Sequence, residues 1–147
     1  MSEEKNIQIF FVGALITSVV GAAMLFLDDF AGWLEGGSND YYVHTGAQFA
    51  GPAPFFLILM AVGLLIASGF SLWGLKDPSA IAEKQLKLVL LISIIVCVVS
   101  ILLAAILAIW LESFATDWWL AGSFYGSLIG GILTVLFLKL AQDNLKK

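Results

Sequence analysis

Four long apolar segments, separated by polar segments, set the pattern of this chain. They cover residues 9–27, 55–75, 88–111 and 120–138, and none of them contains Asp, Glu, Lys, Arg or His. Each is close to the roughly 20 residues that a helix needs to cross a bilayer. The pattern predicts transmembrane helices at about 9–27, 52–75, 78–112 and 118–141, with outer loops at 28–51 and 112–117. The predicted fold class is therefore an all-α integral membrane four-helix (tetraspan) bundle that forms a single domain over 1–147.

Prolines and a capping residue mark where two of these helices start. Pro52 and Pro54 are expected in the first turn of the second helix, where a missing N–H has no helical partner to lose. Asp77 is expected to cap the third helix, with Pro78 at its first position. From Pro78 to the end of the third run the sequence contains no helix breaker, which predicts a continuous helix of about 50 Å. Its first turns, through Lys87, should extend out of a hydrocarbon core of about 30 Å.

The outer loops are predicted to hold short elements. Residues 28–35 suit a short helix on the membrane surface, with its aromatic side chains facing lipid or protein. Residues 41–45 have the β-branched and aromatic content of a strand, although no second strand is evident. The second loop is bracketed by tryptophans, as in the aromatic belt of a membrane interface: Trp110, Trp118 and Trp119.

Composition and charge agree with a membrane protein and suggest its orientation. Of the 147 residues, 61% are hydrophobic and 12% are charged, against about 25% charged in a soluble domain. All seven basic residues are lysines, and both outer loops lack them. The positive-inside rule therefore predicts that the N- and C-termini are cytoplasmic, with the plasma (cytoplasmic) membrane as the expected location. The lysines are Lys5, Lys76, Lys84, Lys87, Lys139, Lys146 and Lys147. Because no basic patch is interleaved with aromatic residues, we expect no nucleic-acid partner.

Columns of small residues occur in the first and last helices. Residues four apart stack on one helix face, and small side chains allow two helix backbones to approach closely in lipid. The columns of the first helix are Gly13, Thr17 and Gly21, and beside them Ala14, Ser18 and Ala22. Those of the last helix are Gly122, Gly126, Gly130 and Thr134, and beside them Ser123, Ser127 and Gly131. We expect these two helices to pack face to face and antiparallel. The broad small face of the last helix leaves room for a second contact, inside the bundle or with another subunit.

Candidate chemistry is sparse. The absence of ionisable residues in the four runs argues against proton-coupled transport and excludes bis-histidine haem ligation within them. Cys97 is the single cysteine, so no internal disulfide forms, and we interpret it as a small packing residue. Asp40 and His44 are the candidate metal ligands, but their spacing matches no established metal motif, and a solvated or partner-facing loop is favoured. We expect no catalytic residue and no cofactor. The outer-loop residues expected to make interactions are Asp28, Asp29, Trp33, Glu35, Asp40, Tyr41, Tyr42 and His44.

The overall plan, with four spans and a larger first outer loop, is similar to that of claudin-like and other tetraspan membrane proteins. The resemblance concerns topology alone. The claudin Trp-Gly-Leu-Trp element and its two following cysteines are absent, since Trp33 stands alone in a loop without cysteine. The tetraspanin Cys-Cys-Gly motif is absent as well, so no functional residue is carried over.

These observations lead to two hypotheses of different class. The first is a non-catalytic membrane protein that acts through helix packing, either self-associating or as an accessory subunit of a membrane complex. Its partners would be the lipid bilayer and other membrane protein subunits or further copies of itself. The alternative is a small channel or transporter subunit whose acidic outer loops gather cations near a pore. An enzyme ranks third, because no nucleophile accompanies the outer-loop carboxylates.

Overall fold

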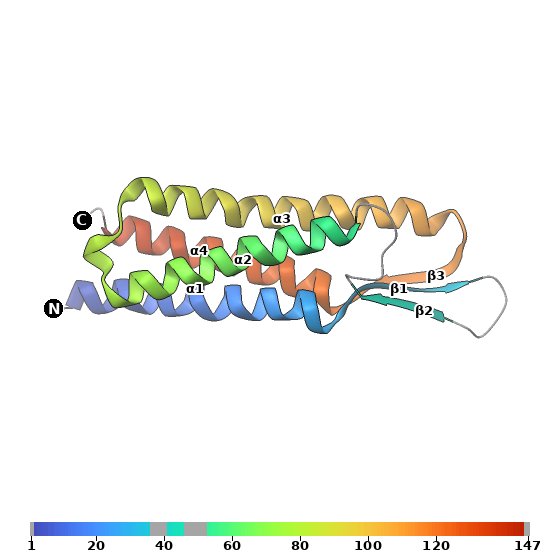
Figure 1. Ribbon diagram of the computed structural model, residues 1–147, viewed down its shortest axis with the longest axis horizontal. Helices are drawn as coiled ribbons and strands as arrows, with labels where there is room; N and C mark the ends of the chain where they lie inside the picture. The colour runs from blue at the N-terminus through green and yellow to red at the C-terminus, as the bar shows by residue number, and fades with distance from the viewer. Residues whose placement is uncertain (1, 36–40, 46–52, 146–147) are drawn as a thin grey trace.

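Four long helices and a small sheet make up the computed structural model, which describes residues 2–35, 41–45 and 53–145. The helices are α1 (Ser2–Leu27), α2 (Ala53–Lys76), α3 (Glu83–Glu112) and α4 (Gly122–Leu145) (Figure 1). All four are long and apolar enough to cross a membrane. The predicted four-helix membrane fold is thus confirmed, and the chain is a multi-pass membrane protein.

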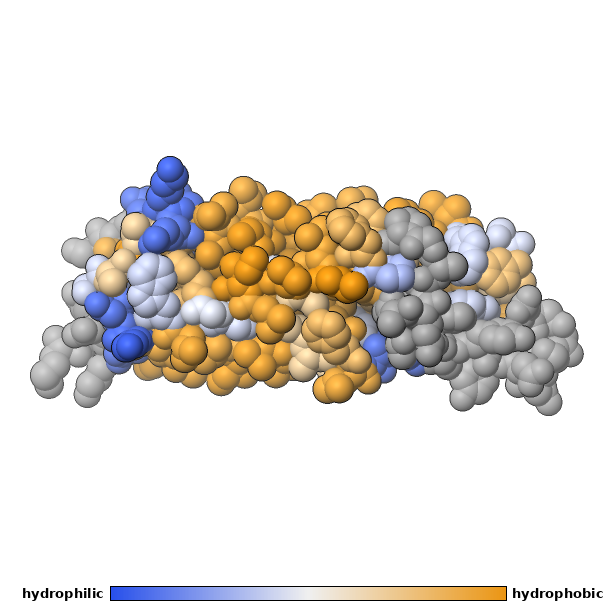
Figure 2. Space-filling model, in the orientation of Figure 1, coloured by the Kyte–Doolittle hydropathy of each residue, from blue (hydrophilic) through white to orange (hydrophobic). Residues whose placement is uncertain are grey.

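The helices form an up-and-down bundle. Neighbours in sequence run antiparallel, so α1 begins and α4 ends at the same end of the molecule (Figure 1). The closest helix pair is α1 with α4, followed by α1 with α2; α3 completes the ring by packing on α4 and α2. Exposed aliphatic side chains form an apolar band around the middle of the bundle (Figure 2). Such a band is what a bilayer core requires, because lipid tails solvate apolar side chains as well as a protein interior does.

The connection between α2 and α3 differs from the prediction. Asp77 caps a short 3-10 turn, Pro78–Ala80, by accepting hydrogen bonds from the backbone N–H groups of Ser79 and Ala80 at 3.1 and 3.2 Å. The chain then becomes extended at Ile81 and Ala82 (ψ 112° and 139°) before α3 begins at Glu83. The prediction of one continuous helix from residue 78 is therefore wrong.

Burial of Ile81 explains this break. The extended backbone lets the Ile81 side chain reach the core cluster at this end, where it is 9% exposed. The Gln85 side chain accepts a hydrogen bond from the Ala82 N–H at 3.2 Å and so caps the new helix. Neither Ile nor Ala is a helix breaker, which is why the sequence pattern does not reveal the interruption. Pro54 lies in the first turn of α2, as expected, while Pro52 lies outside the described residues.

A three-stranded antiparallel sheet lies at the other end of the bundle (Figure 1). Its strands are β1 (Asp29–Glu35), β2 (Tyr41–Thr45) and β3 (Ala115–Leu120), in the order β2-β1-β3. Trp33 at the centre of β1 is paired with Tyr42 of β2 on one side and Trp118 of β3 on the other. We call this end of the molecule the sheet end. The opposite end, where Lys76, Lys84, Lys87 and Lys139 lie, we call the lysine-bearing end.

The sheet confirms one expectation about the outer loops and overturns two. The predicted strand at 41–45 is present, and its partner is β1. The predicted surface helix at 28–35 is wrong, because Asp28 lies in a bend and residues 29–35 form β1. The second loop was expected to end at residue 117 with a helix from 118; instead residues 115–120 form β3, and α4 starts at Gly122. Pairing joins backbone hydrogen-bonding groups of β1 and β3 that lie 80 or more positions apart in sequence. At this separation no local sequence pattern indicates which strand is the partner.

Candidate functional site

The most extensive contact between described helices is the seam between α1 and α4. A β-carbon placed on Gly130 would lie 2.9 Å from the Gly21 Cα and 2.9 Å from the Thr17 carbonyl oxygen. A β-carbon on Gly21 would lie 3.0 Å from the Gly126 carbonyl oxygen. A side chain at Gly130 would force the backbone of α1 to shift, and one at Gly21 would make an unusually tight contact, so glycine at these two positions lets the helices approach closely. The predicted antiparallel packing of the first helix on the last is confirmed.

The same seam extends toward both ends of the two helices. Gly126 lies against the Met24 side chain, and Gly122 lies against Met24 and the Asp28 carboxylate. At the lysine-bearing end, a β-carbon on Gly13 would lie 2.7 Å from the ring of Phe137. The glycines of both helices therefore provide the space into which the larger side chains of the partner helix fit.

Hydroxyl pairs connect the helices at the middle of the bundle. The Thr17 and Thr134 oxygens lie 2.9 Å apart between α1 and α4, and the Ser18 and Ser68 oxygens lie 2.8 Å apart between α1 and α2. Each of these four hydroxyls is also within hydrogen-bond distance of the carbonyl oxygen four residues earlier in its own helix. One hydroxyl of a pair can thus donate across the interface while the other donates to its own backbone, so both are satisfied without water.

A third pair joins α3 to α4. The Ser100 hydroxyl donates to Ser127 at 3.0 Å and also lies 3.0 Å from the sulfur of Met60 on α2. Beside it, a β-carbon on Gly131 would lie 2.7 Å from the sulfur of Cys97. Ser127 and Gly131 therefore face α3, and the second small face of α4 is covered inside the bundle. Of the two alternatives that the sequence leaves open for this face, the structure shows the internal one.

The second column of α1 is also covered by a neighbour within the chain. Ser18 faces Ser68 of α2, and Ala14 and Ala22 are buried. Ser123 has a different role, because its hydroxyl oxygen lies 2.6 Å from the Met24 carbonyl oxygen and also contacts the Asp28 carbonyl oxygen. It thereby ties the first turn of α4 to the end of α1.

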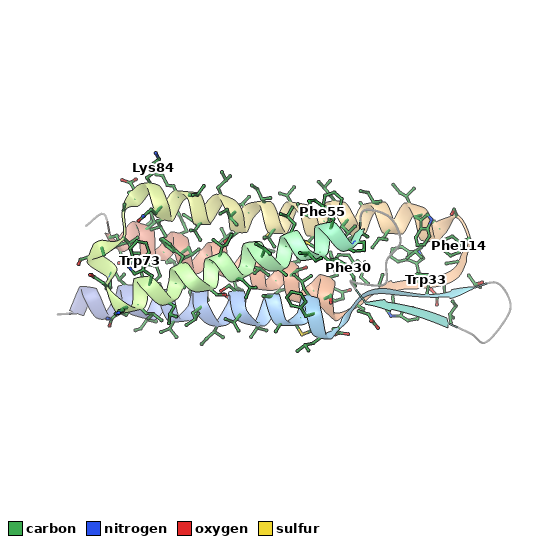
Figure 3. The ribbon with its side chains drawn as sticks, viewed as in Figure 1. Phe30, Trp33, Phe55, Trp73, Lys84 and Phe114 are labelled. Carbon is green, nitrogen blue, oxygen red and sulfur yellow. The ribbon has the colours of Figure 1, made fainter. Side chains whose placement is uncertain are left out.

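Most of the outer-loop residues singled out from the sequence lie on the sheet. Trp33 is 5% exposed and packs edge to face against Trp110 and Phe114 of the α3 end, with ring centroids 5.7 and 6.2 Å away (Figure 3). It is a core residue of the sheet end rather than an exposed contact. Asp28 is half-buried beside the first turn of α4, and its carboxylate accepts a hydrogen bond from the Asp29 N–H at 2.8 Å. A carboxylate is favourable there because the first N–H groups of a helix lack helical partners.

The remaining outer-loop residues are only partly described. Glu35 lies in β1, and Tyr41, Tyr42 and His44 lie in β2, with His44 opposite Ala31. Asp40 lies outside the described residues, so the Asp40 and His44 pair stays a prediction. Among the described residues, no group of three or more His, Cys, Asp or Glu residues lies close enough to hold a metal ion.

Two packing features of the sheet end are not evident from the sequence. Gly32 lies under the Trp119 ring, which would be 2.5 Å from a β-carbon at that position. Phe30 is fully buried and packs edge to face against Phe124 of α4 at 5.7 Å (Figure 3). The glycine among aromatic residues is a signal for such a contact, since glycine within a strand often marks the close approach of another group.

Grooves on the described surface are apolar along the spans. One of about 390 Å³ lies between α1 and α4, lined by residues such as Ile16, Val20 and Ile129. A second, of about 230 Å³, lies between α2 and α3 beside Gly63. These surfaces suit hydrocarbon rather than a polar substrate. No known protein family, curated protein or solved structure matches the chain.

Proposed function

We propose that this chain is a non-catalytic multi-pass membrane protein that acts by assembly, either with further copies of itself or as an accessory subunit of a larger membrane complex. The observation that supports this proposal most strongly is the use of the buried hydroxyls. Thr17, Ser18, Ser100 and their partners hydrogen-bond between helices, so they fix the bundle instead of lining a polar path. Together with the absence of ionisable residues in the four apolar runs, this points to a structural role.

Partners would then bind to the outer surface of the bundle. Most of the small-residue surface of α1 and α4 packs on neighbouring helices of the same chain, and Gly122 and Gly126 also line the open groove between these two helices. What remains for a partner is the apolar surface of the helices and the sheet end, where β3 presents the exposed side chains of Thr116, Asp117 and Trp119. A folded sheet on one end of a membrane bundle is a natural surface for recognition outside the lipid.

The lysines support an orientation for this proposal. Lys76, Lys84, Lys87 and Lys139 lie at the end opposite the sheet, and Figure 2 shows hydrophilic residues gathered at that end. By the positive-inside rule, this end and both termini would be cytoplasmic, and the sheet would lie outside a plasma membrane.

The test is the mass of the particle that forms in the native membrane. The tagged full chain would be extracted with its surrounding lipid by a styrene–maleic acid copolymer and weighed by native mass spectrometry. We expect a defined complex containing more than one polypeptide. A particle with a single copy of this chain and no other protein would contradict assembly.

A flux measurement distinguishes the channel alternative. Purified chain in lipid vesicles would be assayed for cation flux, beside a variant in which Asp28, Asp29 and Asp40 are changed to Asn. The assembly proposal predicts silent vesicles for both proteins. A salt-dependent flux that falls in the neutralised variant would favour the channel instead.

A further inference from the structure

The end of α3 extends past its neighbours. The Ser100 and Ser127 hydroxyls, 3.0 Å apart, set the register between α3 and α4. Toward the sheet end, α4 begins at Gly122, five residues before Ser127, whereas α3 continues for twelve residues after Ser100. About seven residues of α3, or about 10 Å at 1.5 Å per residue, therefore extend beyond the start of α4 and lie beside the sheet (Figure 1).

This extension carries an exposed apolar surface. Ile106 is 59% exposed and Ile109 is 76% exposed. Both lie in the part of α3 that extends beyond the start of α4. They continue a stripe that runs along the lipid-facing side of the span with spacings of three and four residues. The stripe consists of Ile95, Val98, Leu102, Ile106 and Ile109, all exposed, and it ends only at Glu112. The stripe stays apolar and exposed on both sides of the level at which α4 begins.

The length of the stripe places its end relative to a bilayer. Lys87 is the last charged residue of α3 at the lysine-bearing end. A hydrocarbon core of about 30 Å takes up about 20 helical residues, which from Leu88 reaches about Leu107. The headgroup layer adds roughly 5–7 Å on each side, and this is the depth of Ile109 and Trp110.

Aromatic residues gather at the same depth. Trp110 is 46% exposed, and its ring packs against Phe114 with centroids 4.9 Å apart. Both rings contact Trp33 of β1, so this end of α3 packs directly against the sheet (Figure 3). Trp is enriched at membrane interfaces, where an apolar ring and a polar N–H are both accommodated.

We propose that the extension of α3, through Ile106, Ile109 and Trp110 and together with Phe114 just after the helix, is a membrane-interface anchor that is covered by lipid headgroups and upper acyl chains. It holds the sheet against the bilayer on the α3 side. The occupant is lipid because the surface is continuous with the lipid-facing stripe of the span and ends in aromatic residues at headgroup depth. The anchor is independent of whether a partner subunit binds elsewhere on the sheet.

Site-directed spin labelling tests this proposal. A single cysteine would be introduced as Ile109→Cys into a Cys97→Ala background, labelled, and reconstituted into phosphatidylcholine vesicles. Ile95→Cys in the middle of the span is the lipid-facing control, and Thr116→Cys on the exposed part of β3 is the water-facing control. The measurement is the collision rate of each label with oxygen, which concentrates in hydrocarbon, and with a water-soluble nickel complex.

We expect the oxygen-to-nickel collision ratio at position 109 to be several-fold above the ratio at position 116. It should be closer to the ratio at position 95 than to that at position 116. A ratio at Ile109 equal to that at Thr116 would place the surface in water and overturn the proposal. Low collision rates with both reagents would show that protein, such as a second copy of the chain, covers the surface, and this would overturn it too. Ile109 is largely exposed, so its substitution leaves the core intact, and circular dichroism of each variant checks the fold.

Discussion

At the scale of single residues, a hydroxyl can fix two helices to each other where a charged group would be too costly. Thr17 and Thr134 share a hydrogen bond at 2.9 Å while each also faces a carbonyl oxygen of its own helix. Because both groups find local partners in a separated helix as well, the net gain from the shared bond is small. The hydroxyl pairs therefore act mainly on the register of the bundle.

A double-mutant cycle measures this gain. Thr17→Val and Thr134→Val, singly and together, should give a coupling free energy of about 0.6 kcal/mol, the average for such pairs in a membrane protein. The measurement is unfolding in mixed micelles followed by circular dichroism. The matched control combines Thr134→Val with Ser71→Ala, because the buried Ser71 hydroxyl donates only to the Ala67 carbonyl at 2.7 Å. If the coupling free energy of the control were as large as that of Thr17 with Thr134, it would contradict a direct hydrogen bond between these two residues.

Glycine positions differ sharply in what a side chain would meet. Gly130→Ala places a methyl group 2.9 Å from backbone atoms of α1, so we expect a loss of about 1–3 kcal/mol in unfolding free energy. Gly69 on α2 is the matched control, since among the described residues a β-carbon there has no neighbour within 4 Å beyond its own stretch of helix. Gly69→Ala should not lower the unfolding free energy and, because alanine favours a helix more than glycine, should raise it by up to about 1 kcal/mol. Equal effects at both positions would contradict the seam.

Asp77 gives the connection between α2 and α3 a predictable response to acid. The Ser79 hydroxyl donates to its carboxylate at 2.6 Å and, with the backbone N–H groups of Ala80 and Ser79, holds the pKa of Asp77 below its ordinary value of 3.8. A carboxyl with a lower pKa in the folded state stabilises that state above its ordinary pKa. This contribution should therefore be lost as the pH falls from about 3.8 through the lower folded-state value.

Carbon-13 NMR titration of the Asp77 carboxyl in micelles reads the pKa directly. We expect a midpoint below 3.8 in the parent chain and an upward shift in Ser79→Ala. An unchanged midpoint in Ser79→Ala would show that the hydroxyl does not set the pKa.

At the scale of elements, the helices and the sheet differ in how far the sequence can predict them. A long apolar run without charges leaves a transmembrane helix as the only backbone structure that satisfies its own hydrogen bonds in lipid. The strands carry no such signal. β1 is buried on both sides, with Phe30 and Trp33 both in the core, so it lacks the polar and apolar alternation of a half-exposed strand. Its partner β3 is remote in sequence, and its six residues read locally as a loop between tryptophans.

The candidate site divides in the same way. The α1–α4 seam agrees with the prediction from the glycine columns, because small residues four apart allow two helix backbones to approach closely in lipid. The partners of the neighbouring columns do not follow, since Ser18 and Ser127 carry no information about which helix they face. The contact of Gly32 with Trp119 does not follow from the sequence either, because it exists only once β1 and β3 are paired.

The contact between Gly32 and Trp119 can be tested by rescue. Gly32→Val should displace the Trp119 ring, which leaves no space for a β-carbon, and should cost about 1–3 kcal/mol of unfolding free energy. In a Trp119→Ala background the same change should cost much less, because the obstructing ring is gone. Thermal unfolding in detergent of the four proteins gives both values. An equal cost in both backgrounds would show that Gly32 is required for another reason.

At the scale of the whole molecule, the closely packed helix surfaces contact other helices of the same chain. The seam of α1 and α4, the Ser18 and Ser68 pair, and the Ser100 and Ser127 pair connect all four helices. An assembly partner would therefore meet the sheet end or the lipid-facing sides, and the proposed function depends on this distribution. If the seam instead formed between copies, α1 of one chain would lie on α4 of another.

Disulfide trapping of the seam tests this central claim most directly. In a Cys97→Ala background, Thr17→Cys and Thr134→Cys in the same chain should form a disulfide on mild oxidation, because the two native hydroxyl oxygens lie 2.9 Å apart. The account predicts a product with the mobility of a single chain on non-reducing gels. Chains carrying only one of the two cysteines, co-expressed in the same membrane, should remain unlinked. A disulfide-linked dimer of those two chains, or no disulfide in the double variant, would contradict the account.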